Sequence, residues 1–124
     1  KYSYCGKTGM KVPVLSFGAS SLGSVFHETR AAESIKAVFT AIENGMNFID
    51  VSLIMGITGG DSIRKSAERY SAHHFLLSTK VGRYGKDGVN TWDYSARRAT
   101  ESVYESMEAA SDYVDLINVH DIEF

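Results

Sequence analysis

The sequence predicts an α/β fold in which an N-terminal hairpin precedes strands and helices that alternate as β-α-β-α-β-α-β. Two patterns support this prediction: apolar runs of strand length, and intervening segments whose apolar residues recur at helical spacing. Such alternation requires parallel strands joined by helical crossovers. A full (β/α)8 barrel takes ~250 residues, whereas this chain has 124, so it fits an open sheet or half of a barrel.

The composition is that of one globular domain, residues 1–124. Hydrophobic residues make up 44% and charged residues 23%, and 13 Lys+Arg against 15 Asp+Glu leave a formal charge of −2. The basic residues are scattered, so no nucleic-acid partner is expected. No run approaches the ~20 apolar residues of a membrane span, and no signal peptide is visible, so we expect a cytoplasmic protein without a membrane partner. The single cysteine, Cys5, excludes an internal disulfide.

The first third of the chain predicts a hairpin, a strand and a helix. Two extended pieces within residues 2–12 flank Lys7-Thr8-Gly9, and a β-leaning run over residues 12–20 leads into a segment rich in glycine and serine. A helix is predicted after Thr29, its candidate N-cap, and before Asn44-Gly45. The apolar face of this helix consists of Ala31, Ile35, Val38, Phe39 and Ile42.

The next elements continue the alternation. Residues 47–51 form an apolar strand, and a helix with a weaker apolar pattern opens at Gly59-Gly60-Asp61 and runs to Tyr70. Residues 75–81 predict a third strand. The polar segment 82–94 is predicted to be a surface loop, because its glycines do not have the spacing of a phosphate-binding loop.

The last predicted pair is a helix capped by Ser95 and a strand over residues 113–120. Ala99, Val103 and Met107 recur at four-residue intervals, and Met107, like Phe39 of the first helix, is expected in the core. The acidic stripe on this helix is expected to be a solvated face; it consists of Glu101, Glu105 and Glu108.

Three titratable residues lie at the C-terminal ends of predicted strands: Asp50, Lys80 and His120. Singly, each has an ordinary structural explanation, such as a helix cap, a solvated charge or a structural histidine. Together they fall at the edge of a parallel sheet where ligands bind and catalytic groups converge. No metal site is expected, because neither His73-His74 nor His120-Asp121 with Glu123 has a third ligand at suitable spacing.

Four segments resemble motifs of the aldo-keto reductase family. They are Phe17-Gly-Ala-Ser-Ser-Leu-Gly-Ser24, Asn47-Phe-Ile-Asp-Val-Ser52, Leu77-Ser-Thr-Lys-Val-Gly-Arg-Tyr-Gly85 and Asp112-Tyr-Val-Asp-Leu-Ile-Asn-Val-His-Asp-Ile-Glu-Phe124. Within the family the chain is most similar to the L-galactose dehydrogenase-like, sugar-oxidising branch. The resemblance covers the N-terminal half of the family's barrel. It implies half of a (β/α)8 barrel, NAD or NADP as cofactor, and a sugar or carbonyl compound as substrate.

The resemblance also implies roles for the strand-end residues. In the family, a hydride passes between a nicotinamide and the substrate carbon while a tyrosine exchanges the proton, assisted by an ammonium that a carboxylate holds. By position, Asp50 is the carboxylate, Lys80 the ammonium and His120 the imidazole that orients the substrate oxygen. The residues placed near the nicotinamide ribose are Gly18, Ala19, Ser20 and Ser21. Because the family's other cofactor contacts come from later strands, weak cofactor binding is expected of this chain.

The family tyrosine is missing. Where the family has Pro-Tyr-Tyr-Gly, this chain reads Leu53-Ile54-Met55-Gly56, so the proton donor falls on Met55, whose thioether carries no proton. Tyr84 and Tyr94 are the nearest substitutes along the chain. A reading-frame slip across residues 53–74, ordinary divergence and redesign each account for the change, since codons for Pro-Tyr-Tyr read one base out of register yield Leu-Ile-Met.

Three hypotheses for function follow. The first is a partial aldo-keto reductase barrel that is inactive alone, and the second is a non-catalytic half-barrel that serves as a binding or scaffold domain. The third is a homodimer of half-barrels with a composite site. In each case the first and fourth strands are open edges, so self-association is expected.

Overall fold

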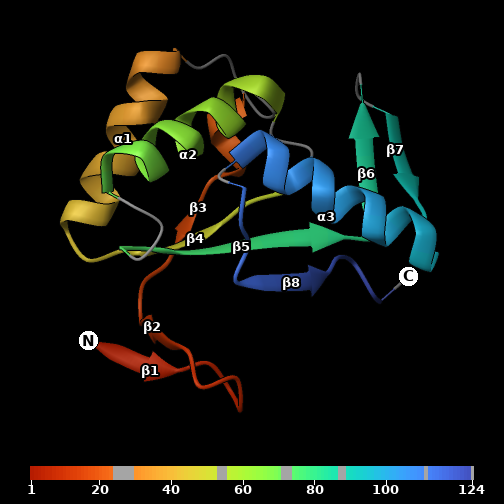
Figure 1. The fold of residues 1–124 in the computed structure, drawn as a ribbon, viewed down its shortest axis with the longest axis horizontal. Helices are drawn as coiled ribbons and strands as arrows, with labels where there is room; N and C mark the ends of the chain where they lie inside the picture. The colour runs from red at the N-terminus through yellow and green to blue at the C-terminus, as the bar shows by residue number, and fades with distance from the viewer. Residues whose placement is uncertain (24–29, 53–55, 71–73, 87–88, 111, 124) are drawn as a thin grey trace.

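The structure, a computed structural model, describes residues 1–23, 30–52, 56–70, 74–86, 89–110 and 112–123. Its centre is a parallel sheet in the order β3-β4-β5-β8; the strands are Phe17–Gly18, Phe48–Asp50, Leu76–Val81 and Leu116–Val119. The crossovers contain α1 (Ala31–Glu43), α2 (Gly56–Tyr70) and α3 (Ala96–Ala110) (Figure 1). The predicted α/β alternation is confirmed.

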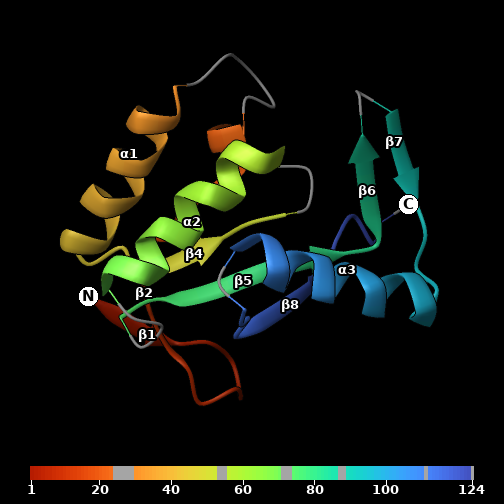
Figure 2. The ribbon, with the colours of Figure 1, turned by 45° about the horizontal axis from the view of Figure 1, so that its top comes forward.

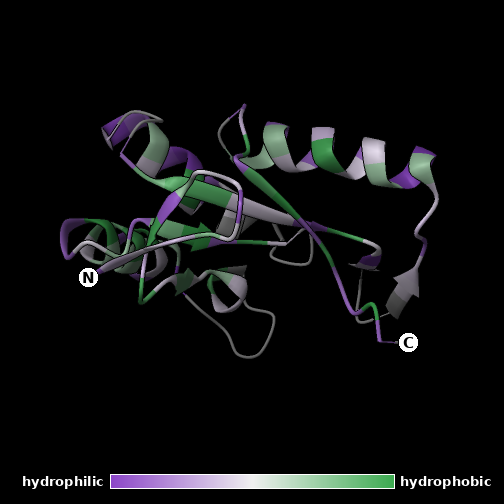
Figure 3. Cartoon of the chain, turned by 90° about the horizontal axis from the view of Figure 1, so that it is seen from below, coloured by the Kyte–Doolittle hydropathy of each residue, from purple (hydrophilic) through white to green (hydrophobic). Residues whose placement is uncertain are grey.

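The helices lie in a row against the sheet. Each crossover moves one strand along in the same direction, and right-handed connections then place all three helices on one face. Accordingly α1 packs on α2 and α2 on α3 (Figure 2). Between the layers, Ile49 of β4, Leu77 of β5 and Ile63 of α2 are fully buried, and apolar residues follow the central strands (Figure 3). Burying each such side chain contributes roughly 1.5–3 kcal/mol.

The predicted N-terminal hairpin is confirmed. Strands β1 (Tyr2–Tyr4) and β2 (Lys11–Pro13) pair antiparallel. Their connection needs left-handed backbone at Gly6 (φ 53°) and Gly9 (φ 78°), which glycine adopts without a Cβ clash. The hairpin lies near the start of β4, because the Tyr2 hydroxyl is the atom nearest to the Cβ position of Gly45.

The first parallel strand is shorter than predicted, since the prediction rested on the whole β-leaning run over residues 12–20. Val12 pairs with Ser3 inside the hairpin, so the early part of the run belongs to another sheet. After Phe17–Gly18 the chain turns into a 3-10 helix over Ser20–Gly23. The prediction was wrong here because hydropathy does not tell which of two sheets a short apolar run joins.

The observed N-terminal boundaries of two helices, α1 and α2, differ from the predicted ones. α1 begins at Ala31 with Arg30 in the N-cap position and no side-chain cap hydrogen bond, whereas the predicted cap, Thr29, lies outside the described residues. The predicted end is confirmed, since α1 stops at Glu43 and Gly45 follows with φ of 81°. α2 begins at Gly56, one turn before the predicted start.

The predicted loop over residues 82–94 is instead a second hairpin. β6 (Arg83–Lys86) and β7 (Val89–Trp92) pair antiparallel and stand beyond the end of β5 (Figure 1). The strands were missed because their residues are mainly polar and show no apolar alternation. Their pairing rests on backbone hydrogen bonds and on cross-strand contacts, including the Arg83 guanidinium 5.7 Å from the centre of the Trp92 ring.

The buried ridge of α3 is made of small residues, contrary to the predicted apolar stripe. Ser102, Ser106 and Ala110 are buried, whereas Ala99, Val103 and Met107 are only half-buried. Phe39 of α1, also predicted in the core, is likewise half-buried. The serines can be buried because each hydroxyl donates to a carbonyl of its own helix, Ser102 to Ala99 at 2.9 Å and Ser106 to Ser102 at 2.8 Å.

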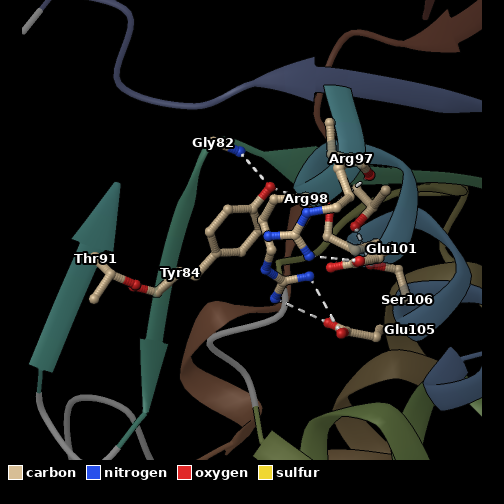
Figure 4. Close-up of polar contacts among 11 residues, drawn as sticks. Gly82, Tyr84, Thr91, Arg97, Arg98, Glu101, Glu105 and Ser106 are labelled. Atoms are coloured by element: carbon tan, nitrogen blue, oxygen red, sulfur yellow. Dashed lines mark hydrogen bonds and ion pairs between the residues drawn. The ribbon is translucent and has the colours of Figure 1, made fainter. Parts of the chain in front are cut away.

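Hydroxyl groups also join α3 to the strands beneath it. The Ser106 hydroxyl lies 2.9 Å from that of Thr79 on β5, and the Ser102 hydroxyl lies 3.3 Å from that of Tyr84 on β6. Arg98 covers the Tyr84 ring, 4.0 Å from its centre, and forms an ion pair with Glu105 (Figure 4). The predicted acidic stripe is therefore exposed but partly neutralised, because Glu101 also pairs with Arg97.

We expect stability to fall at alkaline pH through Tyr113. Burial, together with a hydrogen bond to Asp115, raises the pKa of the Tyr113 phenol. The folded chain thus favours the neutral phenol, so this stabilisation is present below the unfolded pKa of ~10 and is lost as the pH rises above it. Urea midpoints at pH 8, 10 and 11 should fall more steeply for the wild type than for Tyr113→Phe; equal slopes would contradict the prediction.

Candidate active site

The strand register brings the predicted site residues to one edge of the sheet. Gly18 of β3 is paired with Asp50 of β4, and Asp50 is paired with Ser78 of β5. Lys80, two residues further along β5, is paired with Asn118 of β8. Because all four strands are parallel, their carboxyl ends meet at this edge.

Lys80 and Asp50 form a close ion pair between neighbouring strands. The Lys80 Nζ lies 2.6 Å from the Asp50 Oδ2 and donates a second hydrogen bond, of 3.1 Å, to the Val51 carbonyl. The two side chains are 17% and 33% exposed. An ammonium has three donors, so two are used within the described residues and the position of the nitrogen is fixed. The Asp50 Oδ1 is buried without a hydrogen-bond partner in the described part of the chain.

His120 follows β8 at the same edge. Its backbone N–H donates to the Val81 carbonyl at 2.8 Å, and the residue lies two positions beyond Asn118, the partner of Lys80 on the adjoining strand. The side chain is 22% exposed, and its Nε2 lies 3.6 Å from the Asp121 Oδ1. The Nδ1 is buried and has no hydrogen-bond partner among the described residues.

Sequence reasoning missed the residues that surround His120. Asp121 has a left-handed backbone, with φ of 52°, and its Oδ2 lies 2.7 Å from the Arg83 Nη1 at the base of the β6–β7 hairpin. The Tyr94 hydroxyl donates to the His120 carbonyl at 2.7 Å and lies 2.9 Å from the Asp121 carbonyl. The sequence signal that could have found this contact is the opposite charge of Arg83 and Asp121, but the sequence does not show that the two segments meet.

Gly82 lets these segments meet. Its φ is 105°, and a Cβ at this position would overlap the Tyr94 ring. The Gly82 carbonyl accepts the Asp93 N–H at 2.9 Å, which closes the base of the hairpin. Glycine is therefore required here both by the backbone and by the neighbouring ring.

The predicted cofactor-binding residues lie at the end of β3. Gly18 and Ser21 are exposed, Ser20 is half-buried and Ala19 is fully buried. The Ala19 N–H donates to the Asp50 carbonyl at 2.9 Å, which ties this turn to β4. A Cβ at Gly18 would meet nothing within 4 Å, so the chain itself leaves this strand end open.

The two tyrosines proposed as substitute proton donors use their hydroxyls for contacts with groups other than Lys80. The Tyr84 hydroxyl accepts the Gly82 N–H at 3.0 Å and contacts Ser102 of α3, and the Tyr94 hydroxyl is bonded to the carbonyls after β8. Both hydroxyls are therefore committed to structural contacts. Met55, at the position of the family tyrosine, lies outside the described residues.

Parallel strands joined by helices, with polar side chains gathered at the carboxyl ends of the strands, are the arrangement on which (β/α)8 barrels build their active sites. The sequence model of the Aldo/keto reductase family matches residues 14–124. The chain belongs to the aldo-keto reductase family.

Relatives of known sequence include sugar dehydrogenases. L-galactose dehydrogenase of Arabidopsis thaliana is 39% identical over 123 residues, which cover 96% of this chain and 37% of that protein. D-threo-aldose 1-dehydrogenase of a Pseudomonas species is 25% identical over 138 residues, covering 93% of this chain and 42% of that protein. The chain thus spans well under half the length of these relatives.

Solved structures of the same family have the same fold. An aldo-keto reductase of Pseudomonas aeruginosa is 25% identical with a TM-score of 0.83, over 98% of this chain and 47% of that one. An aldo-keto reductase of Bacillus halodurans, solved in its holo form, is 27% identical with a TM-score of 0.81, over 96% of this chain and 39% of that one. The predicted partial (β/α)8 barrel is confirmed by these likenesses.

Within the described part of the chain, no helix has the length and apolar character needed to cross a bilayer. No group of three or more His, Cys, Asp or Glu side chains is placed there so as to hold a metal ion.

Proposed function

We propose that this chain forms the Asp50–Lys80–His120 end of an NAD(P)-dependent oxidoreductase that acts on a sugar. The observation that carries the proposal is the 2.6 Å pair between Lys80 and Asp50 at the carboxyl edge of the sheet. A fixed positive charge at this edge supports a role for Lys80 beside the reacting oxygen. The sugar dehydrogenases among the relatives support a sugar as the substrate class.

Each of the three residues has a task in such a reaction. The nicotinamide would accept or give a hydride at the sugar carbon, and the chain's own residues would handle the oxygen. Lys80, held by Asp50, stabilises negative charge that develops on a neighbouring hydroxyl. His120 orients the substrate oxygen, using an imidazole that stands beside the Asp121 carboxylate.

The end of β3 fits the cofactor only in part. Gly18, Ser20 and Ser21 leave an open strand end next to Asp50, where the nicotinamide ribose would lie, while Ala19 supports this turn from inside the core. We expect weak binding of NAD or NADP, because one strand end offers few contacts.

Gly18→Val should separate folding from cofactor binding. The new side chain meets no atom within 4 Å of its Cβ position, so the free energy of unfolding, measured by urea denaturation, should stay within about 0.5 kcal/mol of wild type. In a chimera that joins this chain to the C-terminal part of Arabidopsis L-galactose dehydrogenase, the KM for the cofactor should rise severalfold. A large loss of stability would show that the strand end is packed rather than open.

A scaffold role is the second candidate, and Met55 is the observation that favours it. Without the family tyrosine, the chain has no proton donor at the expected position. By itself it is expected to have no turnover. In this candidate function, Asp50, Lys80 and His120 are retained for structure alone.

The chimera also discriminates between the two candidates. Sugar-dependent reduction of NAD or NADP is followed by absorbance, first for the chimera that carries Met55→Tyr, which supplies the missing proton donor, and then for the same chimera with His120→Ala or Lys80→Met added. The oxidoreductase proposal expects measurable activity that each substitution lowers at least 100-fold. Activity that is indifferent to both substitutions, in folded variants, supports the scaffold.

We expect the isolated chain to self-associate. β3 and β8 are the two edges of the described parallel sheet, and Ile117 and Val119 of β8 are about half exposed. Unpaired edges with apolar side chains pair with other chains. Light scattering should show a mass that grows with concentration and that Ile117→Lys lowers; a monomer at every concentration would overturn the expectation.

A further inference from the structure

The base of the β6–β7 hairpin carries an aromatic surface close to the strand ends. Trp92, the chain's single tryptophan, is 50% exposed. In the hairpin it is paired with Arg83, which follows Lys80 by three positions. One exposed aromatic residue is common on protein surfaces, but this one is surrounded by polar groups.

Arg83 connects the tryptophan to the segment that carries His120. Its guanidinium carbon lies 5.7 Å from the centre of the Trp92 ring, and its Nη1 lies 2.7 Å from the Asp121 Oδ2. Arg83 and Asp121 are 31% and 19% exposed, so both remain partly accessible. The Tyr94 hydroxyl adds a second link between the hairpin and this segment. These contacts hold an aromatic face, a guanidinium and a carboxylate in fixed relative positions.

This set of groups matches the chemistry of a sugar ring. One face of a pyranose presents C–H groups, which pack on the flat face of an indole. Its hydroxyls both donate and accept, so they can bind a carboxylate and a guanidinium side by side. A phosphate would instead be repelled by Asp121. We propose that Trp92, Arg83 and Asp121 form a subsite that holds the ring of an aldopyranose beside the Asp50–Lys80 pair; this inference rests on the proposed function.

Trp92 itself reports on the binding. Because the chain has one tryptophan, its fluorescence emission comes from Trp92 alone. Titrating the 124-residue chain with L-galactose should give a saturable blue shift as the sugar excludes water from the indole. Galactitol, an open-chain polyol without a ring face, should give no saturable change at the same concentrations.

Isosteric variants test the polar contacts. Asp121→Asn keeps the shape of the side chain but removes the charge, and we expect the half-saturating sugar concentration to rise about tenfold. Asp112→Asn makes the same change at an exposed residue that precedes β8, away from the hairpin, and should leave the titration unchanged. Circular dichroism checks that both variants keep the wild-type fold.

Ligand-observed NMR supplies a readout that does not depend on the fluorophore. Saturation transfer from the protein to the sugar should disappear in Trp92→Leu and persist in Tyr104→Leu, which removes another exposed aromatic residue on α3. Absence of a saturable response to L-galactose, or an equal response to galactitol, overturns the subsite. These binding tests do not involve hydride transfer, so they are independent of the activity assay. If the sugar binds saturably but the chimera is inactive, the proposed function is overturned and the subsite stands. If the chimera is active but the sugar does not bind saturably, the subsite is overturned and the proposed function stands.

Discussion

Replacing Lys80 by methionine is expected to lower the free energy of unfolding by about 2 kcal/mol. The substitution leaves the Asp50 carboxylate without its cation, and its Oδ1 is already buried without a hydrogen-bond partner among the described residues. The loss should be smaller than for a fully buried pair because Asp50 is one-third exposed. Urea denaturation at pH 7 measures it.

Two further variants isolate the cause. Asp50→Asn combined with Lys80→Met removes both charges and should recover most of the loss, because no unpaired charge remains. Arg97→Met breaks the exposed Arg97–Glu101 pair, whose side chains are 75% and 45% exposed, and should cost less than ~0.5 kcal/mol. If Lys80→Met proves as harmless as Arg97→Met, the Lys80–Asp50 pair does not stabilise the sheet edge.

Restoring a tyrosine at position 55 is expected to raise the turnover of the chimera by roughly 10²–10⁴-fold. The family relationship puts the proton donor at this position, where the chain has Met55. A phenol with its ordinary pKa near ~10 exchanges protons slowly at neutral pH, and a neighbouring ammonium such as that of Lys80 favours its ionised form. Steady-state assays with the sugar and the cofactor measure the gain.

The control for this substitution is Met55→Phe, which supplies the ring without the hydroxyl. It should give no gain, and adding Lys80→Met to Met55→Tyr should abolish most of the gain. A phenylalanine variant as active as the tyrosine variant would show that the ring, and not the proton, is responsible. A folded Met55→Tyr chimera without any gain would favour the scaffold.

Prediction from the sequence succeeded for the strands that are marked by a clear apolar run. Asp50 and Lys80 each lie at the C-terminal end of an apolar strand, and the carboxyl ends of parallel strands meet at one edge, so both were expected at this edge, where the structure shows them paired. The prediction failed for the hairpin of β6 and β7, because polar strands resemble a loop. It also failed for α3, where Ser102 and Ser106 are buried by hydrogen bonding rather than by hydrophobicity.

The sequence by itself determined the α/β class, the succession of strands and helices along the chain and the three titratable strand ends, because these depend on periodicity and on local residue chemistry. The tertiary structure decided which groups surround His120. Arg83 and Asp121 are 38 positions apart in the chain, and only the pairing of β5 with β8 and the left-handed turn at Gly82 bring them to 2.7 Å. Contacts between distant segments depend on how the elements pack, and no local pattern in the chain encodes them.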